Sequence, residues 1–246
     1  MPVEFRADLH IHTCLSPCAD LFMTPRNIIE RAASLGIHMI AVCDHNSAEN
    51  IAVTHDLGKK RGITVIPGME ISSSEEVHIL GLFNSLARVL DMQAQVYEHL
   101  QPGENDEHAF GMQVVVNEED EVREFNKRLL IGSTDLPLDR VVALIHGFQG
   151  IAIASHIDRQ GFGVIGQLGF IPPETGFDAL EISSRTSMDT AEETFSMYRS
   201  IPWITSSDAH QLADIGRKTV GLHLNHATFE ELCLALKGAE RRRVIF

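Results

Sequence analysis

Six histidines lie close to the ends of short apolar runs, and acidic residues accompany them. The set comprises Asp8-Leu9-His10-Ile11-His12, Asp44-His45, Glu70, His78, His156 and Asp208-Ala209-His210. Imidazole nitrogens and carboxylate oxygens are the ligands that hold divalent metal ions, and clustered divalent ions hydrolyse phosphate esters. The pattern therefore predicts a metal-dependent hydrolase.

The first motif places two histidines two residues apart. On an extended strand the side chains of His10 and His12 project from the same face, together with that of Asp8, while Leu9 and Ile11 occupy the opposite face. One metal ion could contact both imidazoles. A single His-x-His pair is a weak signal, and it gains weight only from the motifs that follow.

The later motifs each have an ordinary structural alternative. Asp44-His45 and Asp208-Ala209-His210 are also compatible with turns that contain a hydrogen-bonded histidine. His78 and His156 are equally compatible with core histidines. Glu70 follows an apolar strand, and burying its carboxylate is costly unless a cation compensates the charge, so we expect it to bridge two ions.

Apolar runs of strand length alternate with helical patterns along most of the chain, which is typical of parallel strands joined by crossover helices. We expect one domain over residues 1–246, folded as an α/β barrel. The stretch 101–133 is rich in acidic residues, including Glu118-Glu119-Asp120-Glu121, and is predicted to be a solvated insertion. In such barrels the active site gathers at the carboxyl ends of the strands, and we place every proposed ligand at such an end.

Taken together, these motifs resemble those of the PHP (polymerase and histidinol phosphatase) family of metal-dependent phosphoesterases. The resemblance covers nearly the whole chain except 101–133 and rests on this set: Asp8-Leu9-His10-Ile11-His12-Thr13, Cys43-Asp44-His45-Asn46, Gly68-Met69-Glu70, His78, Ser155-His156 and Ser207-Asp208-Ala209-His210. It implies a distorted (β/α)7 barrel with two or three divalent ions, commonly zinc, manganese or iron, at the C-terminal ends of the strands.

The resemblance also implies three sets of metal ligands. The first ion would be held by His10, His12, Glu70 and Asp208, and the second by Glu70, His78 and His156. The third would take His45, His210 and a residue from the loop after the first strand. This loop departs from the usual family pattern because it reads Ser16-Pro17-Cys18-Ala19-Asp20. We choose Asp20 for that ligand, with Cys18 as the alternative.

The expected reaction uses water activated by the metals, with Glu70, Asp208 and His210 as catalytic residues and no side-chain nucleophile. We expect Asp8 and Asp44 to orient the histidines by accepting their free ring N–H groups. Arg159 and Arg185 follow predicted strands and are candidates for binding the substrate phosphate. Arg217, just beyond His210, is a third candidate. Each arginine is about equally compatible with an ordinary surface position.

Charge and composition indicate which substrates the protein can bind and where in the cell it is expected. With 20 Lys+Arg against 34 Asp+Glu, the formal net charge is −14, which should repel long nucleic acid. We therefore expect a small phosphorylated metabolite, a nucleotide or a short oligonucleotide. The N-terminus lacks a secretory signal pattern and no apolar run approaches a membrane span, so we expect a cytoplasmic protein without a membrane partner. The four cysteines are too few and scattered for a disulfide framework.

Two other functions fit the same residues. A metal-dependent amidohydrolase would use clustered metals in a barrel in the same way. A non-catalytic barrel that keeps metals for stability or partner binding is the third reading, but the intact set of ligand residues argues against it.

Overall fold

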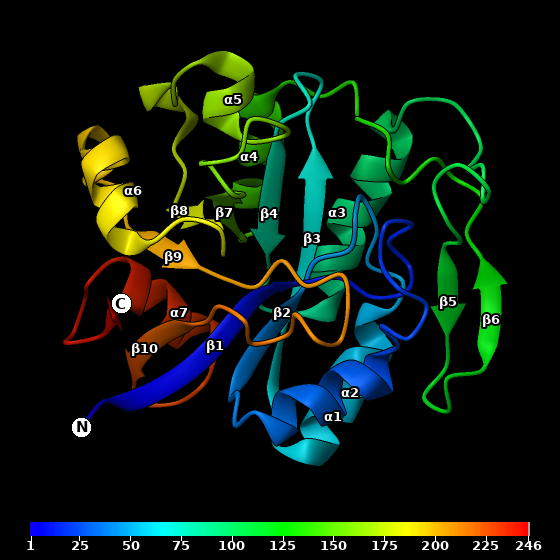
Figure 1. Cartoon of the computed structure of the whole chain (residues 1–246), viewed down its shortest axis with the longest axis horizontal. Helices are drawn as coiled ribbons and strands as arrows, with labels where there is room; N and C mark the ends of the chain where they lie inside the picture. Colours follow the sequence, from blue (N-terminus) through cyan, green and yellow to red (C-terminus); the bar gives the residue numbers. More distant parts are fainter. Residues whose placement is uncertain (246) are drawn as a thin grey trace.

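A mixed sheet of nine strands forms the centre of the computed structural model, which describes residues 1–245 (Figure 1). Neighbouring strands follow the order β11, β10, β1, β2, β3, β4, β7, β8 and β9. Their bounds are β1 (Val3–Ile11), β2 (Met39–Val42), β3 (Thr64–Ser72), β4 (His78–Leu82), β7 (Ile151–Ala154), β8 (Ala179–Ile182), β9 (Trp203–Thr205), β10 (Val220–Leu224) and β11 (Arg243–Ile245). Strands that follow one another in the chain are therefore mostly neighbours in the sheet.

The sheet is a nearly closed barrel because the carboxyl end of β1 also pairs with the segment after β9. Ile11 forms a parallel bridge with Ala209, and the N–H of His12 donates to the carbonyl oxygen of Ala209 at 3.0 Å. The amino half of β1 pairs with β10 instead. Seven strands thus form the ring, which confirms the predicted distorted (β/α)7 barrel, and β10 and β11 extend it at one side.

Strand β4 runs against the predicted direction. It is antiparallel to both β3 and β7, whereas β1, β2 and β3 are parallel to one another, as are β7, β8 and β9. Only the turn from Ser73 to Val77 separates β3 from β4. A parallel crossover needs a dozen or more residues, so this short link forces the chain to reverse.

Strand β1 changes the face it turns toward the barrel part-way along its length. Its pairing with β2 shifts register between Asp8 and Ile11. Ala7 and Leu9 pack in the apolar cluster inside the barrel, whereas Ile11 packs in the cluster beneath the helices. The predicted alternation, with Leu9 and Ile11 on one face, is therefore wrong, because a register shift breaks the two-residue period.

Seven α-helices and two 3-10 helices complete the described part of the chain. They are α1 (Pro25–Ser34), α2 (Ile51–Arg61), α3 (Leu86–His99), α4 (Leu138–Gly147), α5 (Val164–Leu168), α6 (Met188–Phe195), α7 (Phe229–Leu236), η1 (Pro173–Thr175) and η2 (Ser196–Tyr198). Helix α1 shows the local logic, because the Thr24 side chain accepts from the N–H of Asn27 and Pro25 takes the first helical position. None of the helices within residues 1–245 has both the length and the apolarity to span a membrane.

The predicted insertion carries its own small sheet, set apart from the barrel (Figure 1). Strands β5 (Val114–Val116) and β6 (Val122–Phe125) form an antiparallel hairpin. The N–H of Val114 donates to the carbonyl oxygen of Cys14 at 2.9 Å, and the N–H of Val116 donates to Oδ1 of Asn50 at 3.0 Å. The segment is thus more than a solvated excursion, because it is fixed to the loop that follows β1 and to the residue that precedes α2.

Candidate metal centre

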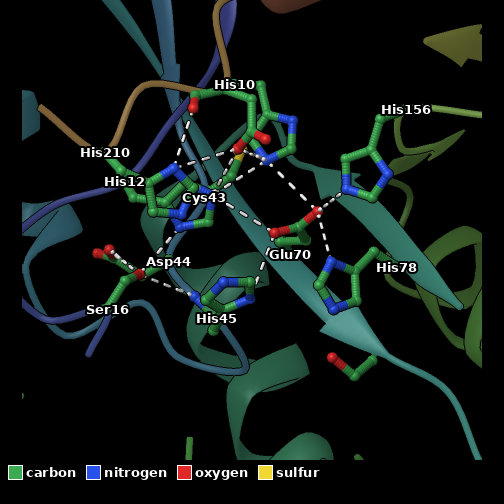
Figure 2. A network of polar contacts seen from close by, with 12 residues as sticks. His10, His12, Ser16, Cys43, Asp44, His45, Glu70, His78, His156 and His210 are labelled. Carbon is green, nitrogen blue, oxygen red and sulfur yellow. Dashed lines mark hydrogen bonds and ion pairs between the residues drawn. The ribbon is translucent and has the colours of Figure 1, made fainter. Parts of the chain in front are cut away.

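The Glu70 carboxylate lies at the centre of a ring of buried imidazoles (Figure 2). Its Oε1 atom is 3.1 Å from Nδ1 of His78, 3.3 Å from Nε2 of His156 and 3.4 Å from Nε2 of His10. Its Oε2 atom is 3.3 Å from Nδ1 of His45 and 3.4 Å from Nε2 of His12. Five histidines that are far apart in the sequence therefore converge on one carboxylate.

Asp208 supplies a second carboxylate to the same cluster. Its Oδ1 atom lies 3.2 Å from Nε2 of His12, 3.3 Å from Nε2 of His10 and 3.6 Å from Nδ1 of His210. Three groups of donor atoms lie within 4.8 Å of one another: His10, His12 and Asp208; His45, Glu70 and His78; His12, His45 and His210. Eight of the nine predicted ligands thus meet at the mouth of the barrel.

Asp20 is the predicted ligand that stays outside the cluster around Glu70 and Asp208. Its side chain is exposed, and its Oδ1 atom accepts from the N–H of Phe22 at 2.8 Å. The alternative, Cys18, is an exposed free thiol. In the third group His12 stands beside His45 and His210, so the structure gives the Asp20 prediction no support. The reason is local, because the loop uses the Asp20 carboxylate to close its own turn.

His78 reaches the cluster from the amino end of its strand, not from a carboxyl end as predicted. It is the first residue of β4 and pairs with Ser72, close to the carboxyl end of β3. Because β4 is antiparallel to β3, the start of β4 lies at the edge where the parallel strands end. The reversal of β4 is therefore what brings His78 to Glu70.

Several residues at this edge adopt positive φ angles without being glycine, and three of them follow β2, β7 and β9. Asn46 (φ 50°) follows β2, His156 (φ 29°) follows β7 and Asp208 (φ 50°) follows β9. Such backbone conformations are strained for most side chains and gather at functional sites. Two of these three residues carry ligand atoms of the predicted metal centre.

The donor set fits divalent cations. Oε1 of Glu70, Oδ1 of Asp208, Nδ1 of His78 and Nδ1 of His156 are buried without a hydrogen-bond partner within residues 1–245. The Nε2 atoms of His10 and His12 lie 3.1 Å apart. The Nδ1 atoms of both rings donate to other groups, that of His10 to Glu181 and that of His12 to Ser16. The lone pairs of the two Nε2 atoms therefore face each other unless a cation or a proton lies between them. Histidine and carboxylate ligands of this kind suit zinc, manganese and iron.

The pKa values of the buried groups are shifted by burial and by the charges of their neighbours. Burial lowers the pKa of His10, but the charges of Glu181, Asp208 and Glu70 outweigh this and raise it well above its usual range. For His12, burial is likewise outweighed by hydrogen bonds to Asp208 and Glu70, which raise the pKa to about 9. Burial opposes ionisation of Glu70, yet the neighbouring His78 and His10 hold its pKa well below normal. The carboxylates therefore stay charged and require positive partners.

Two histidines beside these carboxylates, His45 and His210, have lowered pKa values. Burial lowers the pKa of His210 to about 4, and the charge of His12 adds to this effect. Burial also lowers the pKa of His45 well below its normal value. Both rings are thus neutral at neutral pH, which is the form that binds metal ions.

Outer carboxylates fix the first two ligand rings, but not in the predicted way. Oε2 of Glu181, on β8, accepts from Nδ1 of His10 at 3.0 Å and from the N–H of His156 at 3.0 Å. Asp44 acts on His12 through a hydroxyl: Oγ of Ser16 donates to Oδ1 of Asp44 at 2.7 Å and accepts from Nδ1 of His12 at 3.0 Å. Both rings thereby present Nε2 to the cluster.

Asp8 has a different role from the one predicted. Its carboxylate accepts from the N–H of Ser207 at 3.0 Å and from the N–H of Gly216 at 2.9 Å, instead of from a histidine ring. The register shift in β1 separates its face from that of His10. Asp8 therefore anchors the loop that carries Asp208.

Sequence reasoning missed Glu181 and Ser16. Glu181 is a single carboxylate in the apolar strand β8, and it is 1% exposed. Like Glu70, an isolated carboxylate in an apolar strand needs a positive partner, and this signal could have identified Glu181. Ser16 carries no such signal, because a serine in a turn is ordinary.

The three candidate phosphate-binding arginines gather beside the cluster. Nη1 of Arg159 lies 2.7 Å from Oδ2 of Asp208. Arg159, Arg185 and Arg217 line a pocket of about 710 Å³ whose wall also includes Asp208 and His210. Arg185 and Arg217 are exposed. The pocket thus joins positive side chains to the side of the cluster where Asp208 and His210 lie.

Comparison with known proteins gives partial matches in sequence and a full match in fold. The chain is 32% identical over 80 residues to a phosphoribosyl 1,2-cyclic phosphate 1,2-diphosphodiesterase from Eggerthella lenta, a match that covers 30% of this chain and 29% of that protein. A lesion-specific endonuclease from Pyrococcus furiosus, endonuclease Q, aligns with a TM-score of 0.76 at 19% identity, over 99% of this chain and 58% of that one.

A second structure of endonuclease Q holds a 27-mer duplex with an abasic lesion at its active site. It aligns with the same TM-score of 0.76 at 20% identity, over 98% of this chain and 58% of that one. At this identity the likeness shows the fold alone. The expectation that long nucleic acid is excluded therefore has no support among these neighbours.

The family models cover most of the chain. The model described as PHP domain matches residues 8–162, and the model described as PHP-associated matches residues 190–240. The first match includes six of the eight clustered ligand residues, from His10 to His156. It also spans more than half of the chain, and the chain therefore belongs to the PHP domain family.

Proposed function

We propose that the protein is a metal-dependent phosphoesterase. The observation that carries the proposal is the junction of two features: a buried cluster of histidines and carboxylates, and a pocket lined by three arginines that opens beside it. The first suits divalent cations and the second suits an anionic group. A phosphate ester would offer its charged oxygens to both.

The residues of the cluster would have two roles, to hold the metal ions and to orient the residues that hold them. Two or three divalent ions, zinc, manganese or iron, would polarise a phosphoryl oxygen and make water acidic enough to attack near neutral pH. His10, His12 and Asp208 would hold one ion, Glu70, His78 and His156 a second, and His45 and His210 would contribute to a third. Glu181 and Ser16 keep the first two rings in the metal-binding tautomer.

Arg159 is the residue best placed to bind the substrate phosphate. Its guanidinium already pairs with Asp208 and is one-quarter exposed. A planar guanidinium can donate two parallel hydrogen bonds to phosphate oxygens. Arg185 and Arg217 line the same pocket from exposed positions and would contribute longer-range attraction.

The substrate is a phosphate ester of a small metabolite, a nucleotide or a nucleic acid. Sequence relatives include a cyclic phosphate diesterase, and a fold neighbour is an endonuclease. The net charge of −14 opposes long nucleic acid in general, but the arginine pocket provides a local exception. The chain spans 29% of the curated relative and 58% of the endonuclease, so neither substrate transfers directly.

The test is a hydrolysis panel on purified protein of known metal content. The panel includes a phosphomonoester, a nucleoside bisphosphate, a cyclic phosphodiester, a short oligonucleotide and a duplex with an abasic site, together with amide substrates. We expect phosphate ester cleavage that disappears on chelation and in Glu70→Gln, while the exposed control Glu193→Gln keeps it. Amide cleavage alone would favour an amidohydrolase, and turnover that survives saturating chelation would remove every metal-based reading.

A further inference from the structure

We infer that Phe162 is a stacking surface for a nucleobase, so that the preferred phosphate esters are those of nucleotides. The inference rests on the proposed function and narrows its substrate class. The Phe162 ring lies parallel to the imidazole of His78, with 4.5 Å between the ring centroids and 15° between the planes. The side chain is nevertheless 48% exposed. One part of the ring thus covers a ligand residue while much of it faces solvent.

The backbone holds Phe162 in this position against its conformational preference. Its φ angle is 63°, in the left-handed region that bulky residues rarely adopt. The carbonyl oxygen of Phe162 accepts from the N–H of His78 at 2.9 Å, which ties the loop to the start of β4. Such strain persists only where the surrounding structure enforces it, and it gathers at ligand-binding positions.

The loop between β7 and α5 is packed so tightly that two glycines are required. A Cβ atom at Gly163 would lie 2.5 Å from the carbonyl oxygen of Arg159, and one at Gly166 would lie 2.3 Å from the carbonyl oxygen of Gln160. These close approaches fix the loop backbone on both sides of Phe162. The aromatic ring is therefore presented on a preorganised loop, which reduces the entropy lost on binding.

The same loop carries the cationic group nearest to the cluster. Arg159 contacts Asp208, whereas Phe162 covers His78, so the loop flanks the metal centre at two points. The Nε atom of Arg159 is buried and has no partner within residues 1–245. A nucleotide combines the two matching chemistries in one molecule, an anionic phosphate and a flat aromatic base.

An exposed aromatic face distinguishes a base from an aliphatic group. Every nucleobase has a π-face that can stack on phenylalanine, largely without regard to base identity. An aliphatic phosphate ester would reach the same metals and arginines without this contact. The competing explanation is that Phe162 only shields His78 from water, and then the base of a ligand should make no difference.

Binding to zinc-loaded protein separates these explanations without requiring turnover. Dissociation constants for adenosine 5'-monophosphate and ribose 5-phosphate are measured by calorimetry on the wild type and on Phe162→Leu. We expect the wild type to bind the adenosine compound roughly 5- to 100-fold more tightly, the range expected for one stacked base. We expect Phe162→Leu to remove most of this ratio and the matched control Phe125→Leu, on β6, to keep it.

A second variant gives a direct signal. In Phe162→Trp, indole fluorescence should be quenched by adenosine 5'-monophosphate and not by ribose 5-phosphate. Equal affinity of the wild type for both compounds, or an unchanged ratio in Phe162→Leu with full metal content, would overturn the inference. Failure of the proposed function shows itself differently, as a base preference in binding with no ester cleaved in the hydrolysis panel.

Discussion

The Nδ1 atom of His10 lies 3.0 Å from Oε2 of Glu181, which is 171 residues away in the sequence. Because a carboxylate oxygen can only accept here, His10 donates from Nδ1 and directs Nε2 toward the cluster. That Nε2 atom lies 3.4 Å from Glu70 and 3.3 Å from Asp208. One contact between β1 and β8 thus sets the ring orientation of a central candidate ligand.

Glu181→Gln should therefore weaken metal binding while leaving the barrel folded. The neutral amide removes the negative charge beside His10, and its NH2 group would take the place of an oxygen, Oε1, that now lies 3.2 Å from Nδ1 of His10. Loss of such an outer partner typically costs about 10- to 100-fold in metal affinity or activity. Metal affinity is measured by competition with a chromophoric chelator. Glu193→Gln, an exposed position, serves as the control, and wild-type affinity in Glu181→Gln would refute the assigned role.

Ser16→Ala should lower the free energy of unfolding, whatever its effect on catalysis. The hydroxyl joins Asp44, His12 and the N–H of His45, all buried. Removing it leaves a ring donor and part of a buried carboxylate without partners, at a cost of about 1–3 kcal/mol in the free energy of unfolding. Urea denaturation measures the change. The exposed Ser74→Ala should be nearly neutral, and equal stability of the two variants would contradict the linkage.

Arg159→Ala should lower kcat/KM toward a cleaved phosphate ester by roughly 10- to 100-fold, the range for one lost charged hydrogen bond. Arg159→Lys should recover part of the loss, because the charge remains but the planar pair of donors does not. Arg185→Ala and Arg217→Ala should have smaller effects, since both residues are exposed. Steady-state kinetics on metal-loaded protein checks this, and unchanged kinetics would remove that arginine from the site.

Glu231 provides a test of pH dependence far from the metal centre. Hydrogen bonds from Arg242, at 2.7 and 2.9 Å, are the main cause that lowers its pKa from 4.5 to about 2. A depressed folded-state pKa means that the stabilisation is present above about pH 4.5 and is lost as the pH falls toward 2.

Glu231→Gln should consequently reduce Tm at pH 7 by roughly 2–4 °C, as expected for a loss of about 1 kcal/mol in a chain of this size, because the part-buried Arg242 loses its charged partner. The difference from the wild type should shrink between pH 4.5 and pH 2. Thermal melts across this window measure it, with the neighbouring exposed Glu230→Gln as control. A Tm difference that stays constant with pH would show that the ion pair is not its cause.

The sequence by itself named most residues of the candidate metal centre. Eight of the nine predicted ligands converge, and burial of their carboxylates is costly without a positive partner. The seven-stranded barrel followed from the alternation of strand and helix patterns and from the family resemblance. The three arginines of the pocket were candidates from the sequence as well, Arg159 and Arg185 because they follow predicted strands and Arg217 because it lies beyond His210.

Only the tertiary structure decided how these residues are used. The reversal of β4 brings His78 in from the amino end of a strand, and the register shift in β1 separates Asp8 from the histidines. The Asp20 carboxylate accepts a hydrogen bond within its own turn. The partners of His10 and His12, Glu181 and Ser16, depend on contacts across the barrel and within a loop. Sequence spacing reports the period of a single strand, whereas these roles arise from distances between segments that only the closed barrel sets.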